Sequence, residues 1–317
     1  MIVVLTGGTG GAKFIQGLKE VVPANEITAV VNTGDDLRWW GLHVSPDLDS
    51  ITYALAGLLS AERGWGVEGD TFHCLEAMRG SGAPAWFQLG DRDLATHIFR
   101  TQLLAEGRTL TEATAIIART LGIAARILPM TDARVETRVS TPGGELGFQE
   151  YFVREHYQVR VDGIQFDGAP GASPAPGVVE AIHAAEMVLA APSNPVTSIG
   201  PILAVEGIRE ALRKKSSPIG AISPIVGGVA VSGPAAELMR VQGLPASIEG
   251  IAQAYSDFLD VLIIDERDAG NTAGVERLGM RSHRAQTIMN TLADKAALAS
   301  AAVEALRATR RASAAGH

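Results

Sequence analysis

"VVLTGGTGGAKF" (residues 3–14) leads an apolar run into four glycines and a lysine. A strand that ends in glycines and continues as a helix forms an anion site, because free N–H groups and the helix dipole face the turn. The stretch is not a Walker A loop, since Ala12 and Phe14 flank Lys13. It is not a GxGxxG motif either, because Lys13 stands where the third glycine belongs. We expect a phosphate-binding turn; the alternative is a tight turn that needs glycine only for steric reasons.

Short apolar runs alternate with helical stretches along the chain, which is typical of a parallel sheet covered on both faces. The runs lie at residues 1–5, 27–31, 125–130, 187–191, 218–222 and 260–264. Helices are expected after residue 11 and over 46–60, 91–105, 110–121 and 203–214. The sequence therefore predicts an α/β fold, Rossmann-like, with a mainly parallel sheet flanked by helices.

Two segments depart from this pattern. Residues 135–170 alternate apolar with polar side chains around "PGG", the period of two that antiparallel strands show. Residues 285–317 are rich in alanine and predict a C-terminal helix. We therefore expect a small antiparallel β insertion in an α/β core made of residues 1–134 and 171–284.

The composition excludes several classes of protein. A net charge of −8 argues against a nucleic-acid binder, which needs a basic field. Cys74 is the single cysteine, so an internal disulfide and a CxxC metal site are excluded. No signal peptide is visible, and no run reaches the roughly 18 apolar residues that cross a bilayer. We expect a cytoplasmic protein that binds neither nucleic acid nor membrane.

The segment "SPDLDS" (45–50) starts a predicted helix with two acidic residues in its first turn, Asp47 and Asp49. Acids there can simply complement the helix dipole, worth about 0.3–1 kcal/mol each. They can equally bind Mg²⁺, because this cation prefers carboxylates and bridges them to phosphates. Asp35 and Asp36, after the second strand, could join such a site. Both interpretations remain open.

The segment "LGDRDLATHI" (89–98) begins another helix. Its Arg92 and His97 can reach a ligand, but His97 is also placed four residues after Asp93 and can pair with it on one helix face.

The segment "APSNPVTSIGPIL" (191–203) follows a strand directly, so it lies at the carboxyl edge of the sheet, where such folds bind ligands. Asn194 and Ser198 offer donors there, although the segment can also be a plain loop. Asn32 ends the second strand where dinucleotide-binding folds place an acid for the ribose, which disfavours a nicotinamide-dependent dehydrogenase. The sequence contains no GxSxG or HExxH motif, which removes two classes of hydrolase.

Taken together, these motifs resemble the 2-phospho-L-lactate transferase family of coenzyme F-420 biosynthesis. The matching segments extend, in order, to about residue 268. They are "GGTGGAKF", "VVNTGDD", "SPDLDS", "RGWG", "LGDRDLATHI", "APSNPVTSIGPIL", "SPIVGG" and "DERD". The combination of "SPDLDS" with "LGDRD" and "SNPVTSIGPI" is specific for this family, whereas the glycine stretch alone is weak evidence for it.

The resemblance implies a phosphotransferase whose acceptor is Fo, 7,8-didemethyl-8-hydroxy-5-deazariboflavin, a neutral-to-anionic planar ring on a polyol stem. Its donor is the guanosine diphosphate ester of phospholactate, phosphoenolpyruvate or phosphoglycerate. The ribityl hydroxyl of Fo attacks the acid-side phosphorus, GMP leaves, and coenzyme F-420-0 or its dehydro form results. Mg²⁺ is the implied cofactor and a homodimer the implied assembly. The sequence does not identify the three-carbon acid.

The resemblance also assigns roles to residues. Asp47 and Asp49 are the expected Mg²⁺ ligands and catalytic residues. The expected nucleotide and phosphate contacts are Gly8, Thr9, Gly10, Gly11, Lys13, Asn194 and Ser198. The expected Fo contacts are Asp49, Gln88, Asp91, Arg92 and His97. Gln88 departs from the lysine that archaeal relatives tend to have near the deazaflavin. Trp39 or Trp86 can stack on the ring or belong to the core.

A second interpretation is a regulator. Proteins similar to the gluconeogenesis factor share the glycine-rich opening but bind nucleotide sugars and catalyse nothing. As far as the resemblance extends, that group lacks the paired aspartates of "SPDLDS" and the "LGDRD" helix start.

Overall fold

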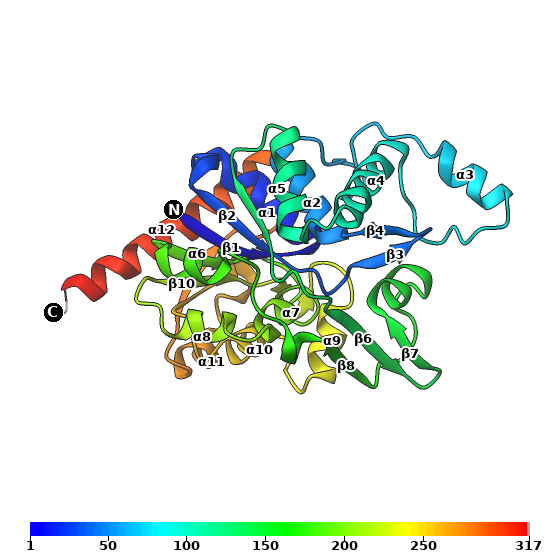
Figure 1. Cartoon of the computed structure of the whole chain (residues 1–317). Helices are drawn as coiled ribbons and strands as arrows, with labels where there is room; N and C mark the ends of the chain where they lie inside the picture. The colour runs from blue at the N-terminus through cyan, green and yellow to red at the C-terminus, as the bar shows by residue number, and fades with distance from the viewer. Residues whose placement is uncertain (316–317) are drawn as a thin grey trace.

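A seven-stranded parallel sheet forms the centre of the computed structural model, which describes residues 1–315 (Figure 1). The strands are β1 (Ile2–Thr6), β2 (Ile27–Val31), β5 (Arg126–Pro129), β9 (Met187–Ala190), β10 (Ile219–Ile222), β13 (Val261–Asp265) and β14 (Arg281–Ala285). Their spatial order is β14-β13-β10-β9-β1-β2-β5. The chain thus leaves β1 in one direction and returns beside it as β9. In such sheets ligands bind at this reversal of strand order.

Helices cover both faces of the sheet, as the apolar runs predict. In β1, Val3 and Leu5 pack into one hydrophobic core, and Ile2 and Val4 pack into the other. The helices over Ile2 and Val4 are α1 (Gly8–Val21), α2 (Pro46–Ala56), α5 (Leu110–Thr120) and α12 (Leu292–Ala315). The helices in the other core are α6 (Val178–Ala184), α7 (Ile199–Ala204), α8 (Ile208–Arg213), α9 (Ala235–Val241), α10 (Ile248–Ala254) and α11 (Ala273–Arg277). Helix α4 (Asp91–Ala105) packs on α5.

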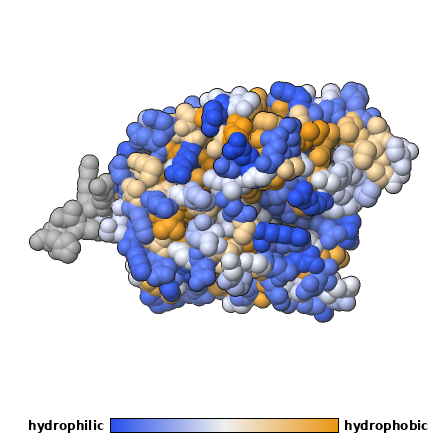
Figure 2. All heavy atoms as spheres, in the orientation of Figure 1, coloured by the Kyte–Doolittle hydropathy of each residue, from blue (hydrophilic) through white to orange (hydrophobic). Residues whose placement is uncertain are grey.

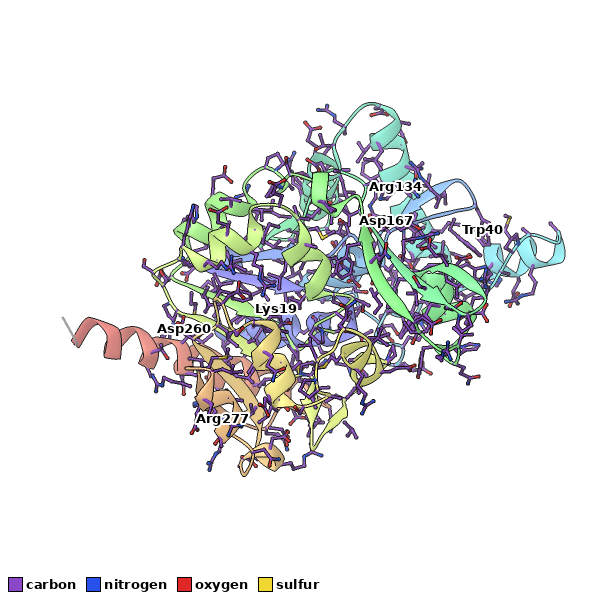
Figure 3. All side chains as sticks on the ribbon, turned by 90° about the horizontal axis from the view of Figure 1, so that it is seen from below. Lys19, Trp40, Arg134, Asp167, Asp260 and Arg277 are labelled. Carbon is purple, nitrogen blue, oxygen red and sulfur yellow. The ribbon has the colours of Figure 1, made fainter. Side chains whose placement is uncertain are left out.

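The predicted antiparallel insertion is present. Strands β6 (Glu136–Thr141), β7 (Gly144–Gly147) and β8 (Gly163–Asp167) form a sheet in the order β7-β6-β8. Arg134 before β6 and Asp167 at the end of β8 lie close together where the insertion leaves the core (Figure 3). Between β7 and β8, however, residues Glu150–Arg154 form a π-helical turn where the alternation predicted strand.

Several short elements were not predicted. A hairpin of β3 (Leu37–Trp39) and β4 (Leu42–Val44) follows β2. Helix α3 (His73–Gly80) lies on an arm that extends away from the core (Figure 1). A second hairpin pairs β11 (Ile225–Val226) with β12 (Val229–Ala230). These elements are too short for a hydrophobic period to identify them.

Four predicted boundaries were wrong. Helix α1 begins at Gly8, so the glycines form its first turn and do not precede it. Helix α2 ends at Ala56, because Gly57 adopts the left-handed conformation (φ 72°). The helix expected over 203–214 is two helices, α7 and α8. The helix expected from 285 begins only at Leu292, and residues 316 and 317 lie outside the described part of the chain.

Most of the face in Figure 2 is hydrophilic, and apolar residues gather over α4, where Ile98 and Phe99 are exposed. Within residues 1–315, no helix is both long and apolar enough to cross a membrane.

Candidate functional site

A cavity of ≈ 570 Å³ opens at the carboxyl ends of the central strands. Its lining includes residues from the segments 7–13, 44–53, 86–97, 148–156, 192–198, 223–235 and 287–290. The glycine segment after β1 and the loop after β9 therefore meet in one cavity. This is the arrangement that the sequence predicts for a shared ligand site.

The first turn of α1 forms one wall of this cavity. The N–H groups of a first helical turn have no partner inside the helix, and Gly8, Thr9 and Gly10 line the cavity. Gly11, also predicted to contact phosphate, is buried behind them, where a Cβ would collide with Thr6. A Cβ at Gly10 would likewise collide with the carbonyl oxygen of Pro192. The glycines therefore allow close packing, as the steric interpretation expects, and they place the first turn of α1 on the cavity wall, while phosphate binding stays a prediction.

Lys13 lies one turn further along α1, half-buried and on the cavity wall. Lys295 of α12 is close enough that burial and the charge of Lys13 lower the pKa of Lys295. The Lys295 ammonium donates to Gln16 Oε1 (2.7 Å). Lys13 thus brings a positive charge to the glycine end of the cavity, which suits an anionic ligand.

The loop after β9 is fixed against α1. Ser193 Oγ donates to the carbonyl oxygen of Gly7 (2.7 Å) and accepts from its N–H (3.3 Å). Asn194 Oδ1 accepts from the backbone N–H of Val196 (2.9 Å), so the carbonyl of this side chain stabilises its own loop. Its amide nitrogen and the hydroxyl of Ser198 are the groups of this loop that remain for a ligand.

Two buried carboxylates, Asp35 and Asp47, line the cavity beside the glycine turn. Asn32 Nδ2, at the end of β2, donates to Asp47 Oδ2 (2.9 Å) and to the carbonyl oxygen of Thr197 (3.2 Å). Burial raises the pKa of Asp47 to about 6, against the effect of the hydrogen bond from Asn32. Burial and the neighbouring charge of Asp47 raise the pKa of Asp35 well above its usual range. The two carboxyl groups therefore repel each other when both are ionised.

Asp36 belongs to a different environment. It accepts a hydrogen bond from Ser45 Oγ (2.7 Å) and lies 2.9 Å from His43 Nε2. It lines a neighbouring cavity of ≈ 740 Å³, between the core and the insertion. Of the two acids that follow β2, only Asp35 lines the cavity beside the glycine turn.

The chain's donor atoms fit Mg²⁺ only in part. Within the part of the chain that the structure describes, no three His, Cys, Asp or Glu side chains cluster as a metal site. Mg²⁺ is commonly bound by one or two carboxylates together with substrate phosphates. Asp47 and Asp35 match that requirement, because both face the cavity and Asp35 Oδ1 is buried without a hydrogen-bond partner among the described residues.

Asp49 also lines the cavity, but its carboxylate is already paired. Both of its oxygens accept from the guanidinium of Arg100, with Nη1 3.1 Å from Oδ2, and the Arg100 side chain is only 2% exposed. The expectation that Asp47 and Asp49 offer two free carboxylates to one metal is therefore not supported. A buried Arg100 needs this counter-charge, and it comes from a position 51 residues away.

His97 extends this network across α4. Its Nδ1 lies 3.5 Å from Asp49 Oδ2, and its Nε2 lies 3.3 Å from Asp93 Oδ1. Asp93 in turn accepts a hydrogen bond from Tyr53 Oη (2.7 Å). Burial would raise the pKa of Asp93, but the interactions with His97, Tyr53 and Arg100 together lower it. The pairing of Asp93 with His97 on one helix face is confirmed, and His97 lines the cavity as well.

Asp91 and Arg92 lie outside the cavity lining. Asp91 accepts hydrogen bonds from Thr71 Oγ1 (2.6 Å) and from the N–H of Cys74 (2.9 Å), at the start of α3. Arg92 Nη1 donates to the carbonyl oxygen of Glu68 (2.9 Å). The structure gives both side chains partners on the arm, and their contact with an acceptor stays a prediction.

Aromatic side chains form a further part of the cavity lining. Trp86, Phe148 and Phe152 lie there together with the exposed Gln88. Trp39 is instead 6% exposed and packs edge-on against Trp86 (4.7 Å between ring centroids). Of the two tryptophans considered for stacking, Trp86 lines the cavity and Trp39 belongs to the core behind it.

Sequence reasoning missed three parts of the lining. They are the π-helical turn after β7, the segment 231–235 and the loop 287–290. A signal for the first existed, because Phe148, Phe152 and His156 are spaced by four residues, a helical spacing. The loop 287–290 follows strand β14, which none of the apolar runs predicted.

Comparisons with known proteins show the family of the chain. Residues 2–309 match the family model described as 2-phospho-L-lactate transferase CofD. The 2-phospho-L-lactate transferase of Methanosarcina acetivorans is 45% identical over 290 residues, which cover 92% of this chain and 94% of that protein. The phosphoenolpyruvate transferase of Streptomyces griseus is 44% identical over 309 residues, 96% of this chain and 97% of that one.

Solved structures show the fold alone. Two crystal structures of Bacillus halodurans protein BH3568, one titled as a member of the UPF0052 family, superpose with TM-scores of 0.62 and 0.65. Their sequence identities are 17% and 15%, and they cover 90% and 95% of this chain. Since the family model spans nearly the whole chain, the protein belongs to the 2-phospho-L-lactate transferase family and is a transferase.

Proposed function

We propose that the protein transfers a phosphorylated three-carbon acid from its guanosine diphosphate ester to the ribityl hydroxyl of Fo, with release of GMP, in coenzyme F-420 biosynthesis. One observation carries the proposal. A single cavity is lined by a helix N-terminus with a lysine, by buried carboxylates and by an aromatic wall. An anionic donor and a planar acceptor can therefore meet beside Asp47.

The donor end is built for phosphate. The backbone of Thr9 and Gly10 at the helix N-terminus and the charge of Lys13 line the space that a pyrophosphate would fill. Asn194 and Ser198 add side-chain donors from the loop after β9, which lies beside the glycine turn. When bound, Mg²⁺ neutralises pyrophosphate charge, and Asp47 with Asp35 would hold it.

The reaction requires that the ribityl hydroxyl is aligned with the phosphorus of the donor and that a group accepts its proton, and it needs no covalent nucleophile. Asp47 has a pKa of about 6, so it is largely ionised near neutral pH and can still accept a proton. Asn32 fixes the orientation of this carboxyl through Oδ2. Asp49, two residues after Asp47 in the same helix, also lines the cavity; held by Arg100, it offers a fixed negative charge that orients the polyol.

The test is a binding titration followed by turnover. A transferase of this kind binds both GDP and Fo, whereas a nucleotide-sugar regulator ignores Fo. The assay then offers phospholactate, phosphoenolpyruvate and phosphoglycerate separately, each with GTP and a guanylyl-transferring enzyme, and detects the phosphodiester product. Failure to form product with all three acids, despite tight GDP binding, would contradict the proposed reaction.

Lys13→Ala is expected to weaken GDP binding about tenfold to a hundredfold, the scale of one lost charged hydrogen bond. Isothermal titration of GDP into wild type and variant measures it. Lys19→Ala is the matched control, since Lys19 lies on the same helix and donates to the carbonyl oxygen of Ala54 (3.2 Å) outside the cavity. Equal GDP affinity in Lys13→Ala and wild type would make Lys13 a helix-surface residue.

Gln88→Lys is expected to keep or strengthen Fo binding, by up to about tenfold, because a cation beside an anionic ring is favourable. Gln88 is exposed on the cavity wall, so the longer side chain has room. Fluorescence titration of Fo measures the affinity. A large loss of affinity would show that the neutral amide makes a contact that lysine cannot replace.

A further inference from the structure

A histidine with an unusual backbone conformation, His156, follows the π-helical turn after β7. His156 and Tyr157 both have left-handed backbone conformations, with φ of 51° and 46°. For residues other than glycine this region is sparsely populated and costs free energy, and such residues concentrate at ligand sites. His156 is exposed and lines the cavity together with Phe148, Phe152 and Val153 of the same segment.

The turn is packed firmly enough to hold this conformation. Phe148 stacks on Phe152 (5.5 Å between centroids), and Phe152 stacks on Tyr157 (5.6 Å). The N–H of Tyr157 donates to the carbonyl oxygen of Tyr151 (2.9 Å), which is fully buried. Val153 packs against the cluster of Trp39, Phe87 and Leu89, which places the turn beside the 86–89 wall of the cavity. A strained residue on a fixed support is therefore presented at the aromatic wall.

Positive charge is scarce in this cavity. The lining residues that can carry it are Lys13, His97 and His156. Lys13 belongs to the glycine end, and His97 lies between Asp49 and Asp93. Among the residues whose side chains are described, none forms a hydrogen bond or ion pair with the His156 imidazole. Gln88, on the facing wall, brings no charge.

The charged groups around His156 are mostly neutralised by one another. On its own turn, Arg154 pairs with Glu150 (2.8 Å) and Glu155 (2.9 Å). Glu145 of the neighbouring β7 lies 3.8 Å from Arg138. Glu237 of α9 is near enough to contribute to the raised pKa of Tyr151, after the larger effect of burial. His156 is thus a side chain of this wall that can carry a positive charge and can pair with a ligand.

We propose that His156 binds the acceptor by pairing with the acidic ring hydroxyl of the deazaflavin, the charge that Gln88 does not supply. The inference rests on the proposed function, since it assumes Fo as the aromatic ligand. An aryl hydroxyl is an acid conjugated to its ring, and a protonated imidazole beside it stabilises the ionised form. His156 is in this sense a binding residue for the acceptor and takes no part in the transfer itself.

The test compares the absorption of bound Fo in wild type and in His156→Asn between pH 5 and pH 8. Asparagine tolerates the left-handed conformation, so the variant should fold. Ionisation of an aryl hydroxyl moves the absorption of its ring to longer wavelength, so the spectrum reports the fraction ionised. In wild type, bound Fo should ionise at a lower pH than free Fo. In the variant this titration should shift upward by about one pH unit, with an affinity for ionised Fo about tenfold weaker.

Three controls make the outcome specific. His156→Lys should restore the low-pH ionisation, while His183→Asn, on the exposed side of α6, should match wild type. GDP affinity should be equal in all variants. If wild type binds Fo and His156→Asn leaves the titration unchanged, the pairing is wrong and the proposed function stands. If wild type binds no Fo, the proposed function and the pairing both fail.

Discussion

Asp47→Asn is expected to lower the transfer rate at least about a hundredfold while leaving the fold intact. The carboxyl group is buried at the cavity wall, accepts hydrogen bonds from Asn32 and from the backbone N–H of Gly8, and has no cationic partner among the described residues. The amide keeps the shape but loses the charge that would face metal and phosphate, and it cannot accept a proton. Raising Mg²⁺ should recover part of the loss if metal affinity is the defect.

Near neutral pH, Asp47→Asn should be more stable than wild type although it is less active. The pKa of Asp47 is raised by burial from 3.8 to about 6. Its contribution to stability is therefore fully present below pH 3.8 and is lost as the pH rises through about 6. Asp47→Asn lacks this loss. Between pH 4 and pH 7, without divalent cation, the free energy of unfolding of wild type should fall by on the order of 1–3 kcal/mol more than that of the variant.

Asp260→Asn is the matched control. Burial also raises the pKa of Asp260, but this residue precedes β13 at the amino edge of the sheet, away from the cavity (Figure 3). It accepts from the N–H of Ile219 (2.8 Å), which asparagine can still do. Denaturant unfolding and turnover of the two variants separate the effects. Normal turnover in Asp47→Asn would remove this carboxyl group from the catalytic centre.

The sequence predicted the place of the site because local patterns determine it. Apolar runs of five residues define strands β1 and β9, and chain direction then brings the ends of parallel strands to one edge. The glycine turn and the 194–198 loop could therefore be placed together without knowing a single contact. Asp47 follows from the same reasoning, since its helix starts from the loop after β2 and the hairpin of β3 and β4.

The parts that sequence could not predict depend on long-range packing. Nothing near Arg100 marks it as the partner of Asp49, because both stand on ordinary helical patterns and meet only when α2 and α4 pack. Residues 148–156 lie inside the segment 135–170 that the sequence predicts as antiparallel strand, but in the structure Phe148 stacks on Phe152, four residues later, and a π-helical turn forms. A hydrophobic period reports which face is buried and cannot report which distant residue it meets.

The ion pair with Arg100 changes what the loss of Asp49 should do. An acid that only complements a helix dipole is worth about 0.3–1 kcal/mol. Removing one partner of a buried ion pair costs about 3–5 kcal/mol, because the other charge is left uncompensated. The free energy of unfolding of Asp49→Asn, measured with denaturant, should therefore be lower than that of wild type by the larger amount. A loss of stability within the smaller range would mean that water or another group compensates Arg100.

Asp49→Asn should also lose at least about a hundredfold in transfer rate, and a second substitution separates this loss from the loss of stability. Arg100→Met added to Asp49→Asn removes the uncompensated guanidinium, so the double variant should regain much of the stability. Its rate should stay low, because the fixed charge beside the acceptor polyol is still missing. Added Mg²⁺ should not rescue either variant, since both Asp49 oxygens pair with Arg100, whose positive charge disfavours a metal ion at this carboxylate. GDP affinity should stay near that of wild type in both. Recovery of rate together with stability would make Asp49 a structural partner of Arg100, and rescue by Mg²⁺ would return it to the metal site.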